Sequence, residues 1–152
     1  MHGKILAAAF LLLAAAPPAW AQVRQGGRYD GQFALVGMRL GELVERFGAP
    51  ASVHAARGAE EWQDDVVFVY PHGDFYVHRD RVWQVGFGSI YGMRVGDPRG
   101  VADLILGERA RDYGGFLVYP LGSLPGAGWP IALRVNFAAG RISAIFVYRS
   151  DF

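Results

Sequence analysis

The chain has 152 residues, 52% of them hydrophobic, which is enough for one domain with its own core. Fifteen basic and 14 acidic residues nearly cancel, so the sequence lacks the clustered positive charge that nucleic-acid binding requires. It contains no cysteine, which excludes disulfides, thiol nucleophiles, zinc–thiolate sites and a cysteine-linked lipid anchor.

Residues 1–21 have the pattern of a secretory signal peptide. Lys4 stands in a short basic head, residues 5–16 are apolar, and Ala19-Trp20-Ala21 forms a small-x-small cleavage signal. The apolar run is too short to span a bilayer, and no later run is longer. We therefore expect a mature protein over residues 22–152 that is soluble in the periplasm or secreted and has no integral membrane segment.

A short motif occurs twice in the mature chain. Gly37-Met38-Arg39-Leu40-Gly41 returns as Gly92-Met93-Arg94-Val95-Gly96, and each copy precedes a short helical pattern and then aromatic strands. Units this small must share one core. The sequence therefore predicts a single tandem-repeat domain, with repeat one at about residues 33–87 and repeat two at about 88–152.

Each repeat should open with a helix of about two turns that ends at a glycine. The first is expected over residues 42–47 and should stop at Gly48, and the second should begin at Asp97-Pro98 and stop at Gly107. Helical spacing predicts the buried residues to be Leu43, Val44 and Phe47 in the first helix and Val101, Leu104 and Ile105 in the second.

Aromatic and β-branched runs after each helix predict strands. Runs at 66–70 and 116–119 each end in Tyr-Pro, and hairpins should follow at 75–87 and 131–148. With turns at Arg79-Asp80 and Ala139-Gly140, regular pairing places Tyr76 opposite Trp83 and Asn136 opposite Ser143.

Regular alternation in the second hairpin then assigns its residues to two faces. The expected core face holds Ile131, Leu133, Val135, Phe137, Ile142, Ala144, Phe146 and Tyr148. The expected solvent face holds Arg134, Asn136, Arg141 and Ser143, together with Ile145 and Val147. The predicted fold class is α+β, with two tandem α–β-hairpin repeats forming one antiparallel sheet and short helices packed on one face.

The sequence resembles the β-lactamase inhibitory protein-like and SmpA/OmlA (BamE-like) periplasmic domains. The features that carry this resemblance are the glycine-flanked opening, the short helix, the Gly-x-Pro stop at residues 48–50 and the aromatic strands. The resemblance covers roughly residues 33–152, and its tandem form is closer to the inhibitory protein. It implies two units in one continuous sheet and binding to another protein. The lipid anchor of one branch and the disulfides of the other are not possible in a chain without cysteine.

We therefore expect a non-catalytic binding or scaffold module, similar to an envelope-assembly factor or a hydrolase inhibitor, that uses the open sheet face. Its partner would be another periplasmic or envelope protein, and no cofactor or metal is expected. The candidate partner-binding residues combine aromatic, arginine and amide side chains, a composition that interfaces favour: they are Tyr76, His78, Trp83, Arg134, Asn136 and Arg141.

The alternative is a small metal-assisted or acid–base enzyme. Its centre would combine His72, Asp74 and His78, because imidazole and carboxylate groups bind divalent metals and transfer protons. No other motif has the spacing of a known catalytic or cofactor site.

Overall fold

The computed structural model describes residues 32–58 and 64–152. The predicted signal peptide lies outside the described residues. Within these residues, two α-helices, α2 (Leu40–Phe47) and α3 (Arg99–Leu106), are accompanied by the short 3₁₀ turns η1 (Phe33–Leu35) and η3 (Gly107–Arg109). None of the helices in the described ranges is long and apolar enough to cross a membrane.

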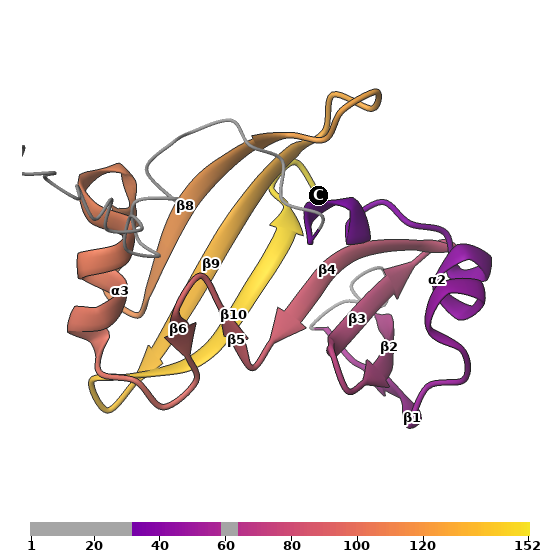
Figure 1. The fold of residues 1–152 in the computed structure, drawn as a ribbon, viewed down its shortest axis with the longest axis horizontal. Coiled ribbons are helices and arrows are strands. Elements are labelled where there is room, and N and C mark those ends of the chain that lie inside the picture. Colours follow the sequence, from indigo (N-terminus) through magenta and orange to yellow (C-terminus); the bar gives the residue numbers. More distant parts are fainter. Residues whose placement is uncertain (1–31, 59–63) are drawn as a thin grey trace, which may run out of the picture.

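An antiparallel sheet of eight strands dominates the structure (Figure 1). Its order is β1-β2-β3-β4-β10-β9-β8-β7, so β4 and β10 meet at the centre through pairs such as Val85 with Val147. A separate hairpin joins β5 to β6. The strands are β1 (Ser52–Ala56), β2 (Asp65–Tyr70), β3 (Gly73–His78), β4 (Arg81–Phe87), β5 (Ser89–Ile90), β6 (Met93–Arg94), β7 (Arg111–Asp112), β8 (Phe116–Ser123), β9 (Pro130–Ala138) and β10 (Arg141–Arg149). The predicted α+β class is therefore confirmed at the level of one large antiparallel sheet with two short helices.

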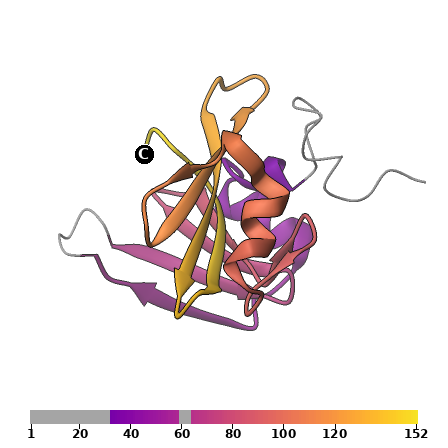
Figure 2. The ribbon, with the colours of Figure 1, turned by 90° about the vertical axis from the view of Figure 1, so that its left-hand side faces the viewer.

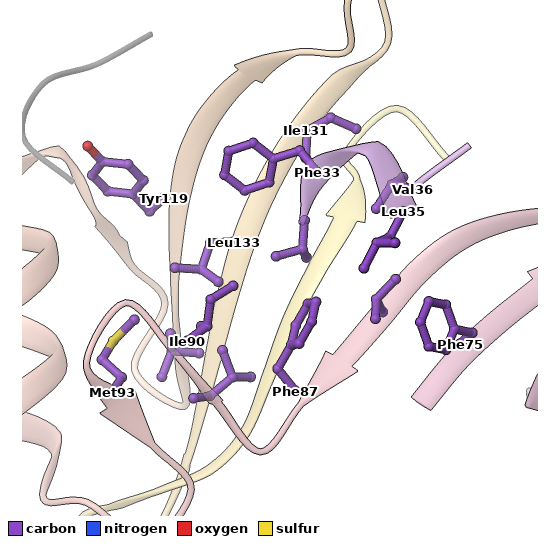
Figure 3. Packing of buried hydrophobic residues seen from close by; sticks show 14 of the residues in the cluster. Phe33, Leu35, Val36, Phe75, Phe87, Ile90, Met93, Tyr119, Ile131 and Leu133 are labelled. Atoms are coloured by element: carbon purple, nitrogen blue, oxygen red, sulfur yellow. The ribbon is translucent and has the colours of Figure 1, made fainter. Parts of the chain in front are cut away.

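Both helices pack on the same face of the sheet (Figure 2). Leu43 from α2 and Ala102, Ile105 and Leu106 from α3 join one buried cluster with inward residues of the central strands. Phe33, Leu35 and Val36 near η1, and Ile90 and Met93 of the β5–β6 hairpin, complete it (Figure 3). The opposite face carries no described helix, and we refer to it as the helix-free face.

The helix ends and helix faces differ in part from expectation. Gly48 and Gly107 do end the helices, with φ of 75° and 61°, values that favour glycine. However, Val44 is 42% and Leu104 is 69% exposed, so both predictions of burial were wrong. The helix α3 begins after Pro98, and the Asp97 carboxylate accepts a hydrogen bond from the Arg94 amide instead of capping the helix.

The two central hairpins turn where the sequence predicted, and each contains a β-bulge. The turn residues Arg79 and Asp80, and Ala139 and Gly140, all have positive φ, as a tight two-residue hairpin turn requires. Beyond the first two pairs the register shifts by one residue, at Trp83 in β4 and at Ser143 in β10.

This shift corrects the predicted faces. Tyr76 lies opposite Gln84, not Trp83, and Asn136 lies opposite Ala144, not Ser143. An extra residue reverses the alternation that follows it. Ile145 and Val147 are consequently buried in the core, while Phe146 and Tyr148 lie on the helix-free face and are half-buried.

Equivalent backbone hydrogen bonds tie each helix to its hairpin. The Gly37 amide donates to the Val82 carbonyl (2.7 Å), and the Gly96 amide donates to the Ile142 carbonyl (2.8 Å). Arg81 and Arg141 each return a guanidinium hydrogen bond of 2.9 Å to the carbonyl of the same glycine. Gly96, the last residue of the second motif copy, therefore has the structural position of Gly37, the first residue of the first copy.

Candidate binding face of the sheet

The helix-free face is formed by alternate residues of the six central strands. The pairing brings Asp74, Gly86, Phe146 and Arg134 side by side across four neighbouring strands. A second row one step along contains Tyr76, Gln84, Tyr148 and Ala132. The aromatic side chains of both rows are half-buried.

Tyr76 and Phe146 form the centre of this face. Their ring centroids lie 6.1 Å apart in an edge-to-face arrangement. Gly86 lies beneath Phe146, where an added Cβ would come within 3.4 Å of the ring. Burial raises the pKa of Tyr76, and the charges of Asp74 and Asp65 add to this effect, so the phenol remains a neutral hydrogen-bonding group at physiological pH.

Arg134 organises the adjoining part of the face. Its guanidinium lies 4.1 Å from the centroid of the Phe116 ring, and its Nε donates a 2.7 Å hydrogen bond to Asn136 Oδ1. The Tyr113 ring stacks on the Phe116 ring, with 4.9 Å between the two centroids. Burial raises the pKa of Tyr148, and the positive charge of Arg134 partly opposes that shift.

The other end of the face holds a buried charged group. Asp65 is 9% exposed, and its carboxylate lies 3.6 Å from Nδ1 of His78. Burial raises the pKa of Asp65, while Trp83 and His78 favour its ionised form. Trp83 stacks on Phe152 at 5.0 Å, and its buried indole nitrogen makes no hydrogen bond of good geometry within the described part of the chain.

The predicted partner-binding residues therefore divide into groups. Tyr76 lies at the centre of the helix-free face, and Arg134 and Asn136 lie in the part that adjoins it. His78 and Trp83 lie at one end of it, engaged with Asp65 and Phe152. Arg141 is exposed, but its guanidinium reaches the Gly96 carbonyl in the loop before α3.

The residues of the alternative enzyme centre do not converge. The His72 ring packs 5.7 Å from Phe47 of α2, whereas Asp74 and His78 stand near opposite ends of β3. Four residues along a strand span about 13 Å, and His78 faces Asp65. Within residues 32–58 and 64–152, no cluster of three histidine or acidic side chains has the arrangement of a metal site.

Phe146, Tyr148 and Phe116 were missed as members of the face. The first two were assigned to the core because regular pairing was assumed across Ser143. A signal was present in the sequence: that pairing placed Ile145 and Val147 on the solvent face. Two β-branched residues in such positions indicate a register shift.

No family model and no curated protein matches this chain. Among solved structures, it is similar to an extracellular protein containing a SCP domain from Bacillus anthracis str. Ames. The identity is 10%, the TM-score is 0.47, and the match covers 84% of this chain and 48% of the other. The chain thus spans about half the length of that protein, and a likeness at this level identifies neither a family nor an activity.

Proposed function

We propose that this protein is a non-catalytic, exported binding module that recognises another periplasmic or envelope protein through its helix-free face. The observation that carries the proposal is the group of half-buried rings of Tyr76, Phe146, Tyr148 and Phe116 on a face without a described helix. The cores of protein interfaces are enriched in such aromatic side chains and in arginine.

The chemistry of the face supports a protein partner. Its aromatic rings supply apolar area with few rotatable bonds, while Arg134, Asn136 and Gln84 offer hydrogen-bonding groups among them. An open groove of about 980 Å³ is lined by Tyr76 and Phe146 of this face and continues to Phe47 of α2. This combination suits an irregular protein surface, in which apolar and polar groups alternate.

We also propose that the domain is a tandem repeat. Three features support two related units. The strand order runs β1 to β4 in one half of the sheet and β10 to β7 in the other, the bulges at Trp83 and Ser143 are equivalent, and Gly37 and Gly96 make matching hydrogen bonds. This arrangement agrees with the resemblance to β-lactamase inhibitory protein-like and BamE-like domains. The identity of the partner would distinguish an inhibitor from an envelope-assembly component.

A quantitative pull-down tests the proposed face. Tagged wild-type protein is compared with Phe146→Ala and with Leu104→Ala, an exposed control on α3. We expect the Phe146 variant to recover at least about tenfold less of a specific partner, and the control to match wild type. Equal recovery by both variants, each folded by circular dichroism, would contradict the proposal.

A further inference from the structure

A pocket of about 410 Å³ lies at the end of the sheet where β4 begins and β10 ends. The rings of Trp83, Trp129 and Phe152 line it, together with Arg79, Arg81 and Arg149. Its volume and aromatic lining fall in the range of small-molecule sites. The centre of the proposed protein-binding face does not account for it, because Tyr76 and Phe146 are not among its lining residues.

The aromatic walls are held in place by specific packing. Trp129 lies against the backbone of Gly37, where a Cβ would approach its ring within 2.8 Å. On Trp129, the guanidinium of Arg149 stacks at 4.2 Å from the ring centroid. Phe152 lies nearly parallel to Trp83, with 19° between the ring planes. The stacked pair of Trp83 and Phe152 therefore forms one flat wall of the pocket, and Trp129 forms another.

The lining of the pocket contains three arginines and no carboxylate side chain. His78 also lines it, with the Asp65 carboxylate 3.6 Å from its Nδ1. Arg81 donates to the Gly37 carbonyl, and Arg149 pairs with Asp151 just outside the lining. Arg79, exposed in the hairpin turn, makes no ion pair within the described residues.

We propose that this pocket binds a small organic anion with a flat apolar body, of the aromatic carboxylate class. The ring system would pack against Trp83, Trp129 and Phe152, and the carboxylate would meet the Arg79 guanidinium at the mouth. Flat walls favour ring stacking over a branched aliphatic ligand, and guanidinium groups bind carboxylates in a charge-assisted geometry. This activity goes beyond the binding of a protein partner.

The test compares 2-naphthoate with its neutral analogue 2-naphthamide, by isothermal titration calorimetry and quenching of tryptophan fluorescence. We expect the carboxylate to bind at least about tenfold more tightly than the amide, as a charge-assisted contact implies. Arg79→Asn, chosen because asparagine tolerates the positive φ of this position, should weaken naphthoate binding about five- to tenfold and leave naphthamide binding unchanged.

Two further variants complete the test. Phe152→Ala removes an exposed side chain that forms part of the pocket wall, and it should weaken the binding of both ligands. Arg111→Asn replaces an exposed arginine of β7 outside the pocket lining, and it should affect the binding of neither ligand. Equal affinity for the acid and the amide, an unchanged naphthoate affinity in Arg79→Asn, or no naphthoate binding at millimolar concentration would overturn the proposal.

Discussion

Two leucines of α3 provide a matched test of how this helix packs. Leu106 is 4% exposed and belongs to the core cluster, while Leu104 on the same helix is 69% exposed. Replacing a buried leucine by alanine removes its apolar contacts and leaves a cavity, at a cost of 2 to 5 kcal/mol in well-packed cores. We therefore expect Leu106→Ala to lower the free energy of unfolding by about 3 kcal/mol and Leu104→Ala to change it by less than about 0.5 kcal/mol.

The assay is urea-induced unfolding followed by circular dichroism, with thermal unfolding as a second measurement. For a domain of this size, a loss of 3 kcal/mol corresponds to a decrease in Tm of roughly 10 °C. The two substitutions remove the same atoms from the same helix, so the difference between their effects reports the difference in burial. Equal losses, or a larger loss for Leu104→Ala, would refute the packing of α3 on the sheet.

Two other predictions concern a buried charge and two glycines. The raised pKa of Asp65 means that the folded state holds the proton on this carboxyl more tightly than the unfolded chain does. Ionisation of Asp65 therefore destabilises the fold above the folded-state pKa, and this destabilisation disappears as the pH falls through that pKa. Asp65→Asn should therefore increase the free energy of unfolding at pH 7, by an amount that shrinks towards about pH 4; urea titrations at both pH values check this, and no gain at pH 7 would contradict it. Gly73→Ala would place a Cβ 2.5 Å from the Gly86 carbonyl oxygen and should lower the free energy of unfolding by at least about 2 kcal/mol. Gly100→Ala in α3, with no atom within 4 Å of the new Cβ, should raise it by about 0.5–1 kcal/mol. Thermal unfolding of both variants checks this, and an unchanged stability of Gly73→Ala would show that β3 and β4 are not packed as described.

The fold class was predictable because strong local signals agree with each other. Gly48 and Gly107 end their helices, and the two hairpin turns fall at the expected dipeptides. Helix phase was less predictable, since a helix of eight residues has only two turns and Leu104 and Leu106 are both apolar. Packing against the buried cluster decides between them, because only Leu106 belongs to it.

The site was predictable only in part, because a single inserted residue in a strand changes which side chains face outward. Tyr76, Arg134 and Asn136 lie on β3 and β9, the strands of these hairpins without the extra residue, and were assigned to the correct face. Phe146 and Tyr148 follow Ser143 and were not. Long-range contacts such as that of Phe152 with Trp83 leave no local pattern in the sequence.

The central claim is that a partner docks on the helix-free face, and site-specific photo-cross-linking tests it most directly. Gln84 lies between Tyr76 and Tyr148 in the middle of that face, and Leu104 is exposed on α3, on the opposite side of the sheet. Each position would be replaced in turn by p-benzoyl-phenylalanine in cells that export the protein. We predict a cross-linked partner of defined mass from position 84 and none from position 104. A cross-link from position 104 without one from position 84 would contradict the account.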